Sequence, residues 1–104
     1  MIYVDNMRMP ARVRGTRGYW SHLTADAKDE LHEFAERLGL KRSWFQTCKR
    51  PCGKPGEPCV HWHYDITDSK RDEAIRLGAE DIDIREMGAI ISARRVALRA
   101  GDPQ

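Results

Sequence analysis

Three cysteines and two histidines lie close together in the middle of the chain, spaced as Cys48-x3-Cys52-x6-Cys59-x-His61-x-His63. Thiolates and imidazoles are the ligands that zinc prefers in proteins, and a Cys-x3-Cys pair falls within the spacing usual for zinc sites. An odd number of cysteines cannot be fully paired within one chain, and in a reducing compartment such a cluster binds metal more often than it forms disulfides. We therefore expect a structural zinc site at Cys48, Cys52 and Cys59 with His61 or His63, and we assign His61 as the fourth ligand.

The segment 60–66 alternates apolar and polar side chains, which indicates a strand with one buried face. His61, His63 and Asp65 share the polar face, where the two histidines lie about 6.6 Å apart at the backbone, from a rise of about 3.3 Å per residue. In a second interpretation these three side chains form a catalytic metal site with a position open for water. In a third, the thiols are free, the histidines are ordinary strand residues and Asp65 caps the next helix.

The elements that carry these residues indicate a small α/β domain. Periodicity and turn residues predict strands at 1–5, 43–46, 60–66 and 82–84, a long irregular loop at 6–23, and helices at 27–38, from 68 to near Gly78, and at 87–98. Strands that alternate with helices favour parallel pairing. We expect one sheet of three to four mostly parallel strands with about three helices.

The length of 104 residues is enough for one hydrophobic core. We expect a single domain over residues 1–104, with a core at 1–90, a Cys-rich loop insert at 48–59 and a tail at 99–104. The composition, 40% hydrophobic and 33% charged, is typical of a soluble globular protein. No apolar run approaches the ~20 residues of a membrane span, and the N-terminus lacks the pattern of a secretory signal. We therefore expect a cytoplasmic protein that does not contact a membrane.

The net charge of +2 hides a segregation of charge along the chain. Residues 6–22 carry four arginines and no acid, and residues 41–54 carry five basic side chains and no acid, while an acidic helix lies between them. Fixed positive charge attracts phosphates or a nucleic-acid backbone regardless of sequence. The alternative is a solvated surface of mixed charge without a ligand.

A second candidate site follows from the predicted fold. In open α/β sheets, ligands bind beyond the carboxyl ends of parallel strands. Asp5, Gln46 and Asp65 each end a predicted strand, and His22 and His63 are available for proton transfer because imidazoles titrate near neutral pH. We assign catalytic roles to Asp5, His22, His63 and Asp65. Together they could form the active site of a metal-dependent phosphodiesterase or nuclease.

Phosphate binding is assigned to polar side chains expected at the same edge. The arginine loop that follows Asp5 would lie over this edge, and the backbone amides that open the helix at residue 68 would receive an anion. The assigned side chains are Arg8, Arg12, Gln46, Ser69 and Lys70. The alternative is that Asp5 binds loop amides, Asp65 caps a helix and the arginines are solvated.

Several segments carry a resemblance to a known family: YVDNMRMPARV, YWSHLTAD, ELHEFAERLGL, SWFQ, HYDITDSKR and AIRLGA. Together they resemble the bacterial and phage family called domain of unknown function 4031, over most of residues 2–87. The Cys-rich insert and the segment IREMGAIISARR are similar to versions encoded by actinobacterial phages. Relatives pass from SWFQ to HYD through a shorter, cysteine-poor connection, which favours a local structural clip for the insert.

The resemblance implies a small stand-alone α/β domain and provides no activity to transfer residue by residue. With the residue assignments above, it predicts a phage-type accessory protein in the host bacterial cytoplasm. We expect this protein to bind a phosphate-bearing ligand, a nucleotide or nucleic acid, at the C-terminal edge of its sheet. The alternatives are a metal-dependent phosphodiesterase or nuclease, and a protein-interaction module with structural zinc that inhibits a host protein.

Overall fold

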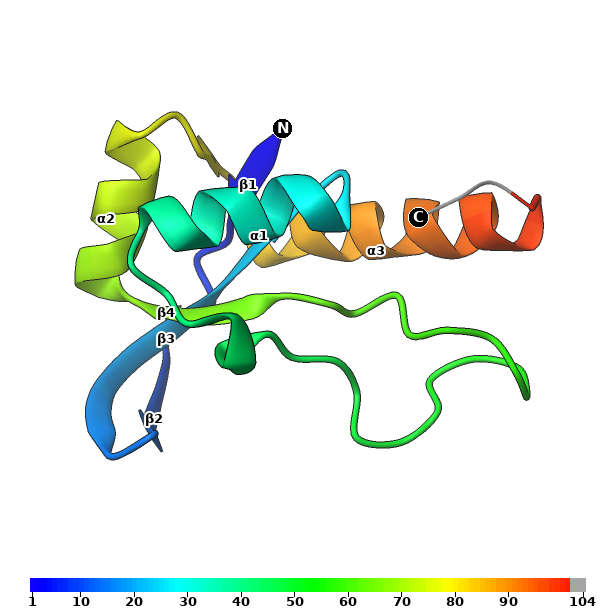
Figure 1. The fold of residues 1–104 in the computed structure, drawn as a ribbon, viewed down its shortest axis with the longest axis horizontal. Coiled ribbons are helices and arrows are strands. Elements are labelled where there is room, and N and C mark those ends of the chain that lie inside the picture. The colour runs from blue at the N-terminus through cyan, green and yellow to red at the C-terminus, as the bar shows by residue number, and fades with distance from the viewer. Residues whose placement is uncertain (102–104) are drawn as a thin grey trace.

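The computed structural model describes residues 1–101, and Figure 1 shows how its elements are arranged. The strands are β1 (Ile2–Val4), β2 (Met9–Val13), β3 (Thr16–Ala25), β4 (Tyr64–Thr67) and β5 (Glu80–Asp81). The helices are α1 (Lys28–Arg37), the 3-10 helix η1 (Arg42–Trp44), α2 (Asp68–Arg76) and α3 (Ile84–Arg99). The mixed α/β fold with three α-helices is confirmed. Of the predicted tail at 99–104, residues 102–104 lie outside the described residues.

All five strands form one sheet around β3. Leu23 of β3 pairs with Val4 of β1 and also with Tyr64 of β4, so β1 and β4 occupy opposite edges of β3. β2 follows β1 along the first edge, and β5 extends the sheet beyond β1. Among the strands of the described residues, only the β1–β5 pair is parallel, whereas β1, β2 and β4 all run antiparallel to β3. The expectation of mostly parallel strands is therefore corrected.

A β-hairpin replaces the irregular loop expected at 6–23, and this hairpin is why the sheet is mostly antiparallel. β2 returns into β3 through Arg14 and Gly15, whose φ angles of 50° and 79° are both positive. Two successive positive φ values are typical of the two-residue turns that match the right-handed twist of a hairpin. An Arg-Gly turn lacks the usual Asn-Gly or Asp-Gly signature, so the sequence pattern did not indicate it.

Two other predicted strands are wrong in detail. Residues 42–44 form the 3-10 helix, and only Gln46 joins the sheet, through an isolated bridge to His63. Residues 82–84, expected to form a strand, do not; the two-residue strand β5 lies immediately before them. Ile84 instead begins α3, because Asp83 and Glu86 form a capping box at that helix N-terminus.

The sheet lies between two helical layers. Leu23 and Thr24 are neighbours on β3 and so point to opposite faces. Leu23 belongs to the hydrophobic core with Leu31 of α1 and Ala74 of α2. On the opposite face, the Thr24 hydroxyl oxygen accepts a hydrogen bond from Arg94 of α3. Helices α1 and α2 therefore cover one face, and α3 covers the other.

Arg94 fastens α3 to the sheet through a buried charge. Its side chain is only 7% exposed, and it donates hydrogen bonds to the Val60 carbonyl at 2.9 Å and the Ala25 carbonyl at 2.8 Å. The guanidinium also lies over the Trp62 ring, 3.5 Å from the ring centroid. Burial lowers the pKa of Arg94 to about 10, so it is still charged at neutral pH.

We expect Arg94→Ala to lower the free energy of unfolding by more than about 3 kcal/mol, because it leaves several buried acceptors without their charged donor. Urea denaturation followed by circular dichroism measures the change. Arg85→Ala is the matched control, since Arg85 is exposed on the same helix and its loss should change stability by less than about 0.5 kcal/mol. Equal stabilities for the two variants would contradict the proposed fastening.

Candidate functional site

Asp5, His22 and Asp65 form a row across three adjacent strands. The backbone N–H of Asp5 donates to the His22 carbonyl at 3.1 Å, and His22 pairs with Asp65 on the other edge of β3. Side chains at paired positions point to the same face of a sheet. The structure therefore brings Asp5 and Asp65 to either side of His22, on the face that α3 covers.

The Asp5 carboxylate is buried, with 1% of the residue exposed, and it holds His22 from two directions. One oxygen accepts the backbone N–H of His22 at 2.9 Å, and the other lies 2.7 Å from Nδ1 of the His22 ring. Burial raises the pKa of Asp5, but the hydrogen bonds from His22 outweigh burial and leave that pKa below its ordinary value. The same hydrogen bond raises the pKa of His22, against the effect of burial.

His63 completes the cluster from the segment that precedes β4. Its Nδ1 lies 2.6 Å from the His61 carbonyl oxygen, which has no proton, so Nδ1 carries the hydrogen and donates it. Its Nε2 then faces Asp65 at 3.2 Å, and its ring meets the His22 ring edge-on with centroids 4.9 Å apart. The Gln46 amide donates to the other Asp65 oxygen at 2.6 Å. Burial raises the pKa of Asp65, but the hydrogen bonds from His63 and Gln46 and the charge of His63 hold it below its ordinary value.

Ligand atoms of His22, His63 and Asp65 all lie within 4.8 Å of one another. We call these three residues the His/Asp centre. In both imidazoles Nδ1 is bound to an oxygen acceptor, which leaves Nε2 as the nitrogen available to a metal. Metal-binding histidines in proteins are oriented in this way by a carboxylate or carbonyl on their second nitrogen. The catalytic metal set expected from the sequence contained His61, and the structure has His22 in that place.

A hollow of about 270 Å³ lies between the sheet and α3, beside His22 and His63 of the His/Asp centre. Its polar wall includes Asp5, His22 and His63, and its apolar wall includes Met87 and Ile91 of α3. A hollow of this volume has room for a small ligand or for one group of a larger ligand. The apolar wall could not be predicted, because the sequence gives no information on where α3 packs.

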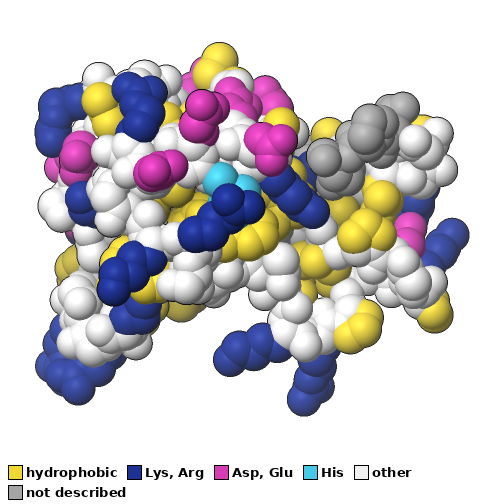
Figure 2. All heavy atoms as spheres, viewed as in Figure 1, with side chains coloured by type: hydrophobic (Ala, Val, Ile, Leu, Met, Phe, Trp, Pro, Cys, Tyr) yellow, Lys and Arg dark blue, Asp and Glu magenta, His cyan; other side chains and the backbone are white. Residues whose placement is uncertain are grey.

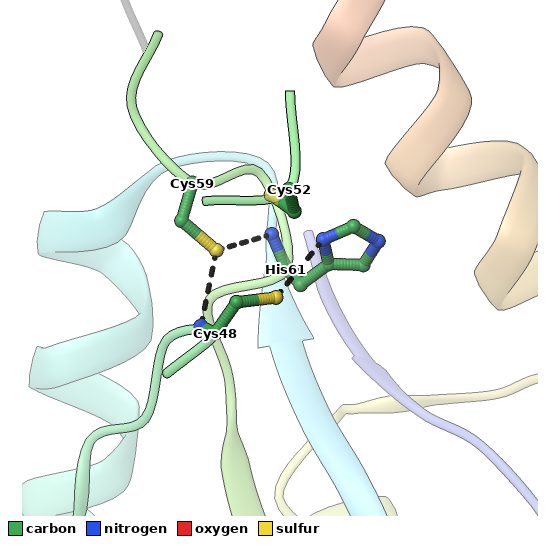
Figure 3. Close-up of side chains that lie close together, drawn as sticks. All are labelled: Cys48, Cys52, Cys59 and His61. Atoms are coloured by element: carbon green, nitrogen blue, oxygen red, sulfur yellow. Dashed lines mark hydrogen bonds between the residues drawn. The ribbon is translucent and has the colours of Figure 1, made fainter. Parts of the chain in front are cut away.

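The thiols gather in a second cluster, which we call the thiol cluster: Cys48, Cys52, Cys59 and His61, drawn in Figure 3. Their ligand atoms also lie within 4.8 Å of one another. The Cys59 sulfur accepts the backbone N–H of Cys48 at 3.3 Å and that of His61 at 3.2 Å. The Cys48 sulfur lies 3.5 Å from Nδ1 of His61. The four residues expected to bind zinc are therefore close together, in an arrangement compatible with a zinc site.

The thiols differ in how readily they ionise. A hydrogen bond from the Val60 backbone, aided by the His61 ring and by Arg95, lowers the pKa of Cys52 to about 6. Burial and the neighbouring thiols raise the pKa of Cys48 to about 11. Three sulfurs this close resist losing all their protons without a cation among them, because like charges repel.

The residues assigned to phosphate binding do not gather around the His/Asp centre, except for Gln46. Arg8 pairs with Asp68 at 2.8 Å, and Arg12 is exposed on β2. The Lys70 ammonium donates to the Leu38 carbonyl at 2.6 Å, on the side of α1. Ser69 is exposed, with its hydroxyl 3.2 Å from that of Thr67. Their proposed roles in phosphate binding stay predictions.

Basic side chains lie on two exposed segments. Figure 2 shows acidic side chains gathered over α1, and Lys and Arg side chains at the β2–β3 hairpin and the Cys-rich loop. Among the described residues, the exposed basic ones in these two segments include Arg12, Arg14, Arg17, Lys49, Arg50 and Lys54. The segregation of charge seen in the sequence is therefore retained on the surface.

A family model described as "Protein of unknown function (DUF4031)" matches residues 2–94. No curated protein and no solved structure matches the chain. Among the described residues, no helix combines the length and the apolar character needed to cross a membrane.

We expect Asp5→Asn to lower the pKa of His22 to its ordinary value or below, because the negative acceptor on Nδ1 is lost. NMR titration of the metal-free protein measures the pKa of His22, and His32 is the internal control because it contacts Tyr64 on the α1 side.

The same variant should also change the pH dependence of stability. In the wild type, the contribution of Asp5 to the free energy of unfolding is lost as pH falls through the lowered pKa of Asp5. The His22 contribution is complete below about pH 6.5 and is lost as pH rises through the raised pKa of His22. The variant should therefore be about 2 kcal/mol less stable between about pH 4 and pH 6.5. An unchanged His22 pKa would show that the Asp5–His22 bond does not form in solution.

Proposed function

The chain belongs to the family of proteins of unknown function DUF4031, and we propose that it is a phosphoesterase whose divalent metal is held by His22, His63 and Asp65. The observation that carries the proposal is the orientation of the two histidines. Each has its Nδ1 bound to an acceptor outside the centre, so Nε2 of each ring is left for a metal, and Nε2 of His63 lies 3.2 Å from the Asp65 carboxylate.

Three protein ligands are typical of a catalytic metal site. Structural zinc sites are closed by four protein ligands, whereas catalytic sites use three and leave a position for water or substrate. A divalent ion in such a site lowers the pKa of a bound water and polarises a phosphoryl oxygen. The hollow beside His22 and His63 provides space for the group that reacts.

The surrounding residues have the parts expected of a supporting shell. Asp5 fixes the ring of His22, and the Gln46 amide fixes one oxygen of Asp65, leaving the other toward His63. Such outer partners set the affinity of a site for its metal. A mixed imidazole and carboxylate set is compatible with zinc, manganese or iron(II).

A phosphate ester fits the charges of the molecule. Asp5 lines the hollow and would repel a phosphate, whereas Arg94 on the wall of the same hollow and a divalent metal at the His/Asp centre would attract it. The exposed arginines of the β2–β3 hairpin and the basic residues of the Cys-rich loop favour the approach of an anionic ligand to the molecule. Arg8 pairs with Asp68 in an exposed ion pair, which is weak enough to open in favour of a phosphate. Hydrolysis of a diester adds water across one P–O bond and yields a monoester and an alcohol.

With Mn²⁺ present, we expect the purified protein to hydrolyse bis(4-nitrophenyl) phosphate, and His63→Ala to lower the rate at least about 100-fold because a ligand is lost. Release of 4-nitrophenol measures the rate. His32→Ala is the matched control, since His32 lies on α1 and binds Tyr64 away from the centre, and it should retain the wild-type rate within about twofold. Absence of hydrolysis in the wild type, or full activity in His63→Ala, would contradict the proposal.

We also infer that the thiol cluster holds a structural zinc ion. Three sulfurs and one imidazole make a closed Cys3His set, and the Cys59 sulfur already accepts two backbone N–H groups that hold it in place. Such an ion would stabilise a loop whose residues 48–59 contain no helix or strand. The His/Asp centre has the open set of a reacting metal, and the thiol cluster has the closed set of a structural one.

Elemental analysis should find one zinc ion per chain that survives dialysis against a weak chelator, and Cys59→Ser should lose it, because serine does not replace a thiolate ligand. Limited proteolysis should then cut the Cys-rich loop faster in the variant. Zinc retained in full by Cys59→Ser would place the ion elsewhere.

A host-protein partner, a phage origin and a cytoplasmic location stay predictions of the sequence. A pull-down with the wild-type chain tests the first. If the wild-type chain captures a stable host partner and shows no metal-dependent hydrolysis, the interaction module is favoured over the enzyme.

A further inference from the structure

The Cys-rich loop begins and ends at the His/Asp centre. Gln46 and His63 lie at its two ends and are joined by two backbone hydrogen bonds, of 2.9 Å and 3.1 Å. Both residues also contact the carboxylate of Asp65, Gln46 through its amide and His63 through its ring. The position of the loop ends therefore determines the shape of the centre.

His61, a member of the thiol cluster, also contacts His63 of the His/Asp centre. Its ring faces the Cys48 sulfur at 3.5 Å, and its backbone N–H donates to the Cys59 sulfur at 3.2 Å. Its carbonyl oxygen accepts the Nδ1 hydrogen of His63 at 2.6 Å. A single residue, Trp62, thus separates His61, whose ring contacts a thiol, from His63, whose ring would bind the metal of the His/Asp centre.

The two histidines of the centre depend on different parts of the chain. His22 is oriented by Asp5, and both lie where β1 meets β3 in the sheet. His63 is oriented by the carbonyl of His61, whose ring and backbone N–H both contact the thiol cluster at the end of the loop. A change in the loop should therefore move His63 and leave His22 in place.

We propose that zinc at the thiol cluster sets the affinity of the His/Asp centre for its own metal, by fixing the His61 carbonyl that orients His63. This inference rests on the proposed function, since it assumes a metal at His22, His63 and Asp65. Loss of an outer partner of a ligating histidine weakens metal binding about 10- to 100-fold in other proteins. The thiol cluster would then control the activity of the centre.

The test compares Mn²⁺ binding by the zinc-loaded wild type and by Cys59→Ser. Mn²⁺ is the probe because it prefers carboxylate and imidazole to thiolate, so it reports on the His/Asp centre alone. Titration followed by electron paramagnetic resonance of free Mn²⁺ gives the dissociation constant. We expect Cys59→Ser to bind Mn²⁺ about 10- to 100-fold more weakly than the wild type. Lys49→Ala is the matched control, because it alters an exposed side chain of the same loop and should leave the affinity unchanged.

A second readout locates the effect at His63. In the zinc-loaded wild type, the Nδ1 hydrogen of His63 should give a protected NMR signal, because it is hydrogen-bonded to a fixed carbonyl. That signal should disappear in Cys59→Ser, while the corresponding signal of His22 remains, because Asp5 still holds it. Loss of both signals together would show general unfolding of the site and would overturn the proposal. If Cys59→Ser does not fold, Cys48→Ser carries the same test, because Cys48 is the exposed thiol of the cluster.

The proposal and the function it rests on fail in different ways. If a zinc-free, folded Cys59→Ser protein binds Mn²⁺ with wild-type affinity and keeps both signals, the coupling between the two sites is overturned. The metal site at His22, His63 and Asp65 is not contradicted by that result. Absence of Mn²⁺ binding in the zinc-loaded wild type overturns both. Weakened binding with selective loss of the His63 signal supports both.

Discussion

The buried hydrogen bond between Asp5 and His22 is the interaction on which the site depends. A carboxylate removed from water is costly unless charged or polar partners compensate it. Asp5 receives the His22 ring and two backbone N–H groups, while its own carbonyl accepts a hydrogen bond from Arg71 of α2 at 2.6 Å. The Asp5 side chain thus occupies a place in the ladder between β1 and β3 that a backbone carbonyl would normally take. This exchange fixes the end of β1 and the orientation of the His22 ring together.

Two sites of different character share one short segment of chain. His61 faces the thiols, and His63 faces the carboxylate of Asp65. Their chemistry differs because sulfur ligands select a closed structural ion, whereas a carboxylate with two imidazoles leaves a position open. The segment 60–66 can serve both because its alternate residues Val60, Trp62, Tyr64 and Ile66 are buried and hold the backbone in place.

Much of this could be predicted from particular residues. The alternation at 60–66 correctly placed its apolar side chains in the core, and the spacing of Cys48, Cys52, Cys59 and His61 correctly grouped them. The closeness of His22 and His63 could not be predicted, because it depends on the antiparallel register of β3 and β4, and the weak signature of the Arg-Gly turn left β3 unrecognised as a strand. Residues were assigned to the sheet edge on the assumption of parallel strands, and Asp5 and Asp65 still lie on either side of His22, because β1 and β4 both pair antiparallel with β3. The position of Lys70 could not be predicted in this way, because α2, the helix after β4, directs the Lys70 ammonium group toward α1.

The most direct measurement is anomalous diffraction from crystals grown with Mn²⁺, collected at the manganese absorption edge. The account requires a manganese peak bounded by Nε2 of His22, Nε2 of His63 and the carboxylate of Asp65, with Asp5 still bound to Nδ1 of His22. A map with no peak there, or with manganese at the thiols alone, would contradict it.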